Sequence, residues 1–200
     1  MKKNISLKEM VQAECGASCI CDSRTTPLIF DTNALKYRYA LNEDSDYKVV
    51  LTCGVLYEVK KNKSLFKPDV LRQIYSMLNP QIITPFVSEE DEYLIGKSAS
   101  NTPKRLEKGG DIGWVDTAQI GYAMERARNN LSTILISNDG DILSTVKNLR
   151  RILEYMKDKV SCVSVQRYLE RKYFSQLDGL ERPFKRALFT EIDSQYKIAS

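Results

Sequence analysis

The sequence has no histidine among its 200 residues, and it has little glycine, proline or tryptophan. An active site in this chain therefore has no imidazole to serve as a base or as a metal ligand. With nine glycines and six prolines, the composition also excludes a linker-rich or collagen-like chain. What remains is an ordinary globular balance of 42% hydrophobic and 28% charged residues, enough for one domain with a buried core.

Long hydrophobic runs are also absent. The longest lie at 131–136 and around 49–56, far below the ~20 residues that a membrane-spanning helix needs. The chain begins with two lysines after its methionine, but no apolar stretch of signal-peptide length follows them. Five cysteines, an odd number, fit a reducing compartment better than a disulfide framework. We therefore expect a cytoplasmic protein that makes no contact with a membrane.

The alternation of apolar runs and helical spacing predicts the fold class. Strands are expected at 27–30, 47–53, 81–86, 132–137 and 160–165. Helices are expected at 32–40, 54–63, 69–78, 88–95, 113–129, 141–156 and 166–173, with a loop over 96–113. Strands that alternate with helices indicate an α/β fold with a parallel sheet covered on both faces. The chain then divides into an accessory segment (1–26), a domain (27–175) and a polar tail (176–200).

Four acidic residues occupy comparable places in this pattern. Asp31 follows the first strand directly, and Asp139 comes two residues after the fourth. Glu58 and Asp116 each lie about one turn inside a helix, the first after strand two and the second before strand four. Ligands of parallel sheets bind beyond the carboxyl ends of the strands, so the four acids are expected to converge there. A single Asp after a strand is more often a helix cap, and it is the ordered set that favours a site.

Converging carboxylates repel one another unless a cation neutralises them. Oxygen ligands without histidine favour Mg²⁺ or Mn²⁺ over zinc or copper. In phosphodiester hydrolysis such ions lower the pKa of an attacking water and stabilise the charge on the phosphoryl oxygens.

The acids stand in short motifs that resemble those of PIN-domain nucleases. The motifs are IFDTNAL (29–35), VLYEVK (55–60), WVDTAQIGYA (114–123) and ISNDGDI (136–142), in the family's order. The resemblance covers 27–165 and implies a three-layer α/β/α sandwich with a five-stranded parallel sheet. It implies an endoribonuclease dependent on Mg²⁺ or Mn²⁺, in which Asp31, Glu58, Asp116 and Asp139 hold the metal. Thr32, Asn33 and Ser137 match the positions that orient those acids.

Two further acids, Asp111 and Asp141, each allow two interpretations. Asp111, in GGDIGWVD, is either an extra metal ligand or the N-cap of the following helix. Asp141 either contacts metal through water or caps the helix that it begins, and capping is the commoner role. Cys15, Cys19 and Cys21 have no standard zinc spacing and are better explained by small-residue packing.

Positive charge is unevenly distributed, although the net charge is only +4. The flank from 147 to 186 has eleven Lys and Arg against five Asp and Glu. The loop before Asp116 carries Lys97, Lys104, Arg105 and Lys108. We expect the loop, above all its last three cations, and the flank to hold the RNA backbone beside the metal site. The alternative is that these are only solvated faces.

Three functions compete on the sequence alone. The first is the endoribonuclease, and the second is an RNA- or protein-binding module of the same fold with weak catalysis. The third, a phosphatase or receiver domain, is disfavoured because Asn33 stands where an aspartyl phosphatase has its second acid. The RNA target, a homodimer, and an antitoxin or other protein partner are left open.

Overall fold

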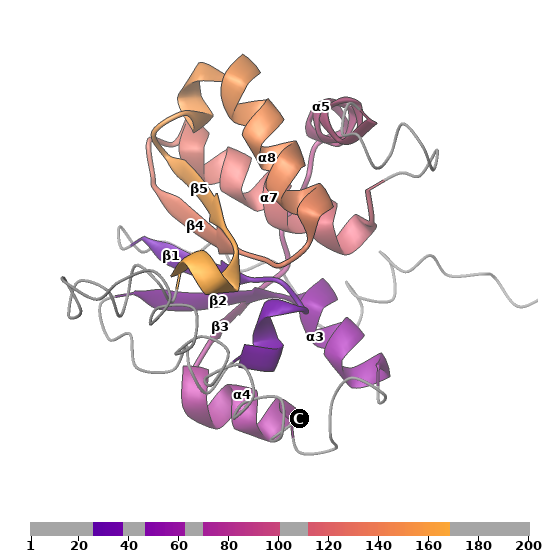
Figure 1. Ribbon diagram of the computed structural model, residues 1–200, viewed down its shortest axis with the longest axis vertical. Coiled ribbons are helices and arrows are strands. Elements are labelled where there is room, and N and C mark those ends of the chain that lie inside the picture. Colours follow the sequence, from indigo (N-terminus) through magenta and orange to yellow (C-terminus); the bar gives the residue numbers. More distant parts are fainter. Residues whose placement is uncertain (1–25, 38–46, 63–69, 101–111, 169–200) are drawn as a thin grey trace, which may run out of the picture.

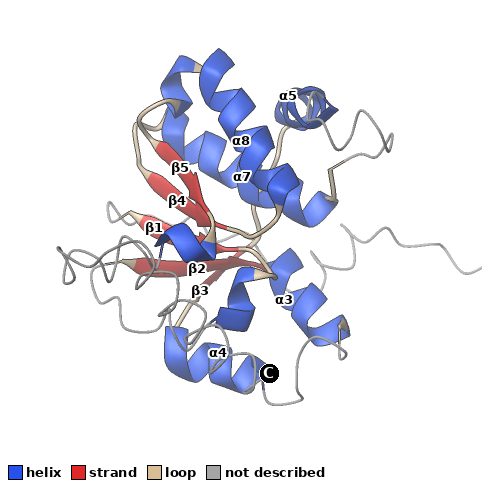
Figure 2. Cartoon of the chain, viewed as in Figure 1, coloured by secondary structure: helices blue, strands red, loops and turns tan. Residues whose placement is uncertain are grey.

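The protein is described by a computed structural model over residues 26–37, 47–62, 70–100 and 112–168. Helices and strands alternate along the chain (Figures 1 and 2). The elements are β1 (Pro27–Phe30), η1 (Ala34–Tyr37), β2 (Lys48–Thr52), α3 (Cys53–Lys61), α4 (Val70–Leu78), β3 (Gln81–Ile83), α5 (Glu89–Ser100), α7 (Trp114–Arg128), β4 (Thr133–Ile136), α8 (Gly140–Ile152), η2 (Glu154–Met156) and β5 (Val160–Val163).

The five strands form one sheet in the order β3-β2-β1-β4-β5, and every pairing is parallel. Strand β1 lies at the centre, where Ile29 pairs with Val50 on one side and Leu135 on the other. All four residues of β1 are buried, as expected for a strand covered on both faces. The predicted α/β fold with a five-stranded parallel sheet is confirmed.

Helices cover both faces of the sheet and give three layers (Figure 1). On one face, η1, α3 and α4 pack against alternate strand residues such as Leu28 and Leu51. On the other, α5, α7 and α8 pack against Ile29, Val50 and Leu135. Because successive strand residues point to opposite faces, these short apolar strands supply both halves of the core.

Several element boundaries differ from those predicted. Strand β3 stops at Ile83, because its partner β2 ends at the paired residue Thr52, where α3 begins. Helix α5 runs on through residues expected in a loop, as far as Ser100. Its last turn is held by packing, since Ile95 and Ala99 are buried and the Asn148 amide donates to the Ser98 carbonyl. Lys97 therefore lies on a helix, where its ammonium stands over the Tyr93 ring.

The structure bears on the state of the cysteines and on membrane-spanning helices. Cys53 is buried in the core and disulfide-bonded, whereas the odd number of cysteines had favoured a reducing compartment over a disulfide framework. The segment that holds Cys15, Cys19 and Cys21 lies outside the described residues. Within the described part of the chain, no helix combines the length and hydrophobicity needed to cross a membrane.

Candidate active site

Asp31 is the first residue beyond the central strand. Its backbone N–H donates to the carbonyl of Ile136 at 3.0 Å, which extends the β1–β4 ladder by one residue. One carboxylate oxygen, Oδ1, accepts from the backbone N–H of Thr32 at 2.6 Å, and Oδ2 accepts from the Ser137 hydroxyl at 2.9 Å. Asp31 is only 3% exposed. Its carboxylate is therefore fixed in place at the carboxyl edge of the sheet.

Ser137 joins Asp31 to Asp139. While its hydroxyl donates to Asp31, its oxygen accepts from the backbone N–H of Asp139 at 2.9 Å. Asp139 is the N-cap of α8, and its Oδ1 accepts from the backbone N–H of Asp141 at 2.7 Å. The N-cap is thus Asp139 and not Asp141, so the favoured capping role of Asp141 was wrong. Capping leaves Asp139 at the helix N-terminus, where a negative charge is favourable.

Glu58 comes from a third segment. It lies in the second turn of α3, a helix that begins beyond β2 with Thr52 as its N-cap. The Thr32 hydroxyl donates to the Glu58 carboxylate, so the residue after Asp31 ties Glu58 to the same edge of the sheet. Thr32 thus contacts both acids, by its backbone toward Asp31 and by its side chain toward Glu58.

Asp116 lies in the first turn of α7, whose N-cap is Gly113. This first turn packs against the start of α3 at Gly54. A Cβ added to Gly54 would lie 3.0 Å from the nearest Val115 methyl and 3.1 Å from the Trp114 ring. Glycine therefore permits the close approach of the two helices that carry Glu58 and Asp116.

All four predicted acids line one cavity of about 560 Å³. Thr32 and Asn33 line it with them, together with two residues that the sequence analysis did not single out, Lys61 and Asn62. Lys61 follows Glu58 by three residues, a spacing that places both on one side of α3. That spacing was the only available signal for Lys61, and it is common on solvated helices.

The cavity disfavours negative charge in the absence of a cation. Burial raises the pKa of the Asp31 carboxyl above its usual range, and the charge of Asp139 adds to this, against the hydrogen bonds from Ser137 and Thr32. Burial also raises the pKa of Glu58, opposed by the Thr32 hydroxyl and assisted by the charge of Asp31. A bound cation would remove this penalty, because it favours the ionised carboxylates.

The residues fit a hard cation in the type of donor that they offer. Four carboxylates and no histidine are the ligands of Mg²⁺ or Mn²⁺ and not those of zinc. As the side chains stand, however, no three acids, cysteines or histidines of the described residues are close enough together to hold one ion. Metal binding at this site therefore requires the carboxylates to turn toward the centre of the cavity.

Other predicted site residues lie outside the described part of the chain, namely Asp111, Lys104, Arg105 and Lys108. Asp111 does not occupy the N-cap of α7, because Gly113 does. The predicted basic flank is described only as far as residue 168. Its first cations, Lys147, Arg150 and Arg151, lie in the later turns of α8 and do not line the acidic cavity.

Comparisons of the chain with models of protein families, with curated proteins and with solved structures found no match. The fold class therefore rests on the sheet and its helices, and the function rests on the site.

Proposed function

We propose that this chain is a metal-dependent endoribonuclease of the PIN-domain type. The observation that carries the proposal is the single cavity that four acids line, although they come from four separate segments. Two of these acids are placed directly by strand ends of the parallel sheet, at the edge where such folds bind ligands. The sheet order β3-β2-β1-β4-β5 is consistent with the PIN-like sandwich that the motifs imply.

Each residue of the site has a distinct part in the proposal. Asp31, Glu58, Asp116 and Asp139 would hold Mg²⁺ or Mn²⁺, which when bound supplies an acidified water and stabilises charge on the phosphoryl group. Ser137 and Thr32 are positioning residues, because their hydroxyls bond to Asp31 and Glu58. Lys61 lines the same cavity and offers a positive charge to the phosphate of the substrate.

A weakly catalytic binding module is the second candidate. The observation in its favour is that the acids already serve the fold, since Asp139 caps α8 and Asp31 accepts two hydrogen bonds. Against it stands the burial of Asp31 and the half-burial of Glu58 beside other acids, which raises the pKa of both carboxyl groups and which a binding module does not need. We also propose that the substrate is RNA and that the protein acts in the cytoplasm.

The test is cleavage of a pooled set of single-stranded and structured RNAs by the full chain. We expect cleavage with Mg²⁺ or Mn²⁺, none with EDTA, and recovery when the metal is restored. Products with internal ends would distinguish endonuclease from exonuclease action. RNA that is bound but left intact in both metals would contradict the proposal and support the binding module.

A further inference from the structure

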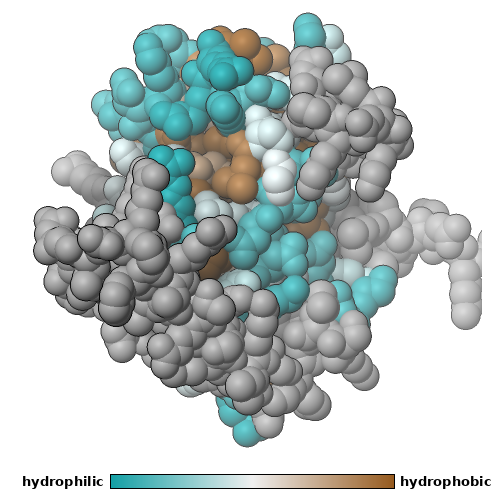
Figure 3. Space-filling view, in the orientation of Figure 1, coloured by the Kyte–Doolittle hydropathy of each residue, from teal (hydrophilic) through white to brown (hydrophobic). Residues whose placement is uncertain are grey.

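A second charged cavity lies near the C-terminus of α8. It has a volume of about 340 Å³ and is lined by five charged residues, Lys147, Arg150, Arg151, Glu154 and Lys157. We call it the basic pocket, because four of these side chains are cations and one is an acid. In the space-filling view, hydrophilic side chains gather at the top of the molecule, toward its left side (Figure 3).

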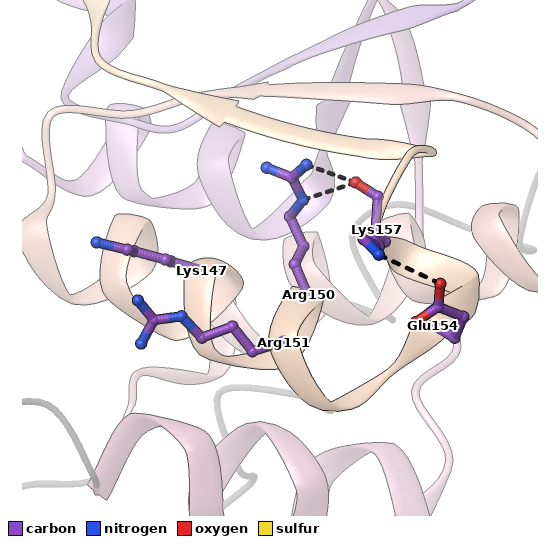
Figure 4. A pocket seen from close by; sticks show the side chains of 5 residues that line it. All are labelled: Lys147, Arg150, Arg151, Glu154 and Lys157. Atoms are coloured by element: carbon purple, nitrogen blue, oxygen red, sulfur yellow. Dashed lines mark hydrogen bonds and ion pairs between the residues drawn. The ribbon is translucent and has the colours of Figure 1, made fainter.

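The cations of the basic pocket are partly fixed in place. The Arg150 guanidinium donates through Nε to the carbonyl of Lys157 at 3.0 Å, and a second of its nitrogens donates to the same oxygen. Figure 4 shows these two bonds, together with the ion pair between Lys157 and Glu154 at 3.6 Å. The single acid is therefore engaged by Lys157, and it does not offset the other three charges.

Lys147 and Arg151 extend in the same direction from α8 (Figure 4). They are four residues apart, a spacing at which like charges on a helix repel each other. Neither forms an ion pair with another described residue, whereas Arg128 elsewhere pairs with Asp91. An anion bound between the two side chains would relieve this repulsion. A purely structural role would not account for two neighbouring cations that repel each other.

One side of α8 runs from Gly140, the residue after Asp139, to the basic pocket. Residues 140, 144, 147 and 151 fall on one stripe of the helix, because their spacings of four, three and four residues follow the helical period. Gly140, Lys147 and Arg151 on this stripe are exposed, Ser144 is half-buried, and none of the four is acidic. At about 1.5 Å per residue, Lys147 lies ~12 Å and Arg151 ~18 Å along the helix from Asp139.

We infer that the basic pocket is a second binding site for the phosphodiester backbone of RNA, remote from the acidic cavity. A strand that enters the cavity at Asp139 and follows this stripe reaches Arg151 after about five phosphates, at ~3.4 Å per phosphate in a helical strand. The identity of the ligand rests on the proposed function. The stripe therefore selects substrates by length, because a short RNA ends before it reaches the pocket.

The competing explanation is that Arg150 and Arg151 only stabilise the end of α8. Cations in the last turn of a helix interact favourably with its dipole. This explanation predicts a change in stability but no change in RNA affinity, and it gives no role to Lys147, which lies one turn earlier.

The experiment measures binding of the full chain to labelled single-stranded RNAs of three and twenty nucleotides, in EDTA so that no cleavage occurs. We expect Lys147→Ala/Arg151→Ala to weaken binding of the longer RNA only. Two lost phosphate contacts should flatten its log–log salt dependence by about 1.4, at roughly 0.7 per contact. Lys147→Gln/Arg151→Gln, which keeps more of the side-chain length, should behave alike.

The matched control is Lys48→Ala/Arg72→Ala, which removes one lysine and one arginine from exposed positions on β2 and α4. An equal effect of the two double variants would overturn the inference, and so would a wild type that binds no RNA in EDTA. Competition by inorganic phosphate as strong as that by RNA phosphates would identify a free-phosphate site instead and would also overturn it. Cleavage of the three-nucleotide RNA with metal tests the proposed function separately, because that RNA does not reach the pocket.

Discussion

The acidic cavity and the basic pocket lie toward opposite ends of α8 and are built in opposite ways. The cavity collects one acid from each of four segments that are far apart in the sequence. In the cavity, Asp31 is buried, and it accepts hydrogen bonds from the Thr32 backbone and the Ser137 hydroxyl. The pocket collects its cations from a single stretch, 147–157, and they are exposed.

This difference in exposure determines how much the repulsion between like charges destabilises the fold. Exposed cations are solvated and screened by salt, so the basic pocket costs the fold little. Asp31 is buried and Glu58 is half-buried, and this loss of hydration raises the pKa of both carboxyl groups, so a bound cation would favour their ionised forms. We therefore expect single changes to act strongly in the cavity and by small steps in the pocket.

A third charged arrangement shows what a structural role requires. Asp91 on α5 is 4% exposed, and Arg128 on α7 donates to both of its carboxylate oxygens. The hydrogen bond to Asp91 is the main cause that raises the pKa of Arg128 above its usual range. Opposite charges are paired where charge holds two helices together. In the acidic cavity four of the charged lining residues are acids, and in the basic pocket four of the five are cations, so like charges predominate in both.

The largest effect is expected from Asp31→Asn. It should lower RNA cleavage by more than about 100-fold, because even outer-shell changes at metal sites cost 10–100-fold. The metal-free variant should melt at the same or a higher temperature, since the amide carries no buried charge and still accepts from Thr32. Asp158→Asn, at an exposed acid before β5, is the control. Retained cleavage, or a large loss of melting temperature, would remove Asp31 from the site.

The next largest effect is the stabilisation by added metal, which should depend on the acidic cavity and not on the basic pocket. At a Mn²⁺ concentration of 100 times Kd, binding to the native state adds about 2.7 kcal/mol to the free energy of unfolding. We expect this gain in the wild type and in Lys147→Ala/Arg151→Ala, but not in Asp31→Asn. Denaturant melts with and without Mn²⁺ measure it. An equal gain in Asp31→Asn would place the ion somewhere other than the acidic cavity.

A smaller effect on stability is expected from a substitution where α3 and α7 pack closely together. Gly54→Ala should destabilise the fold by about 1–3 kcal/mol, because its Cβ would press on Val115 and Trp114. It should also reduce cleavage, since it separates the helices that carry Glu58 and Asp116. Gly96→Ala is the matched control: nothing lies within 4 Å of its Cβ, and in a helix it should stabilise by ~0.5–1 kcal/mol. Denaturant melts that rank the two variants alike would refute the close-packing argument.

The sequence predicted the sheet and the acidic cavity better than the other features. A short apolar strand followed by an acid, as before Asp31 and Asp139, indicates that the strand is buried. It also indicates that the acid lies at the carboxyl edge of the sheet. The last turn of α5 was missed because it is stabilised by contacts with α8, and Gly96 argues against a helix there. The N-cap at Asp139 was assigned to Asp141 because either residue suits the position, and only the backbone geometry decides between them.

The basic flank was predicted to lie beside the metal site; its described cations Lys147, Arg150 and Arg151 do not line the acidic cavity, and its residues beyond 168 lie outside the described part. Its spacing puts Lys147 and Arg151 on one side of a helix, but the direction in which α8 leaves the acidic cavity is a property of the tertiary fold. Lys61 could not be singled out, because a lysine near the end of an amphipathic helix is usually solvated.

The smallest effect should come from the helix cap, and it separates the two roles of Asp139. Asp139→Ala loses the acceptor for the Asp141 N–H and should cost about 1 kcal/mol in the free energy of unfolding. Asp139→Asn keeps an oxygen there and should cost almost nothing, because Asn caps as well as Asp. Both variants should lose cleavage. Ser88→Ala removes the comparable acceptor for the Asp91 N–H at the start of α5, so it should cost a similar amount while cleavage is retained. If cleavage followed stability across these three variants, Asp139 would be a cap alone, and the acidic cavity would lose one of its four proposed ligands.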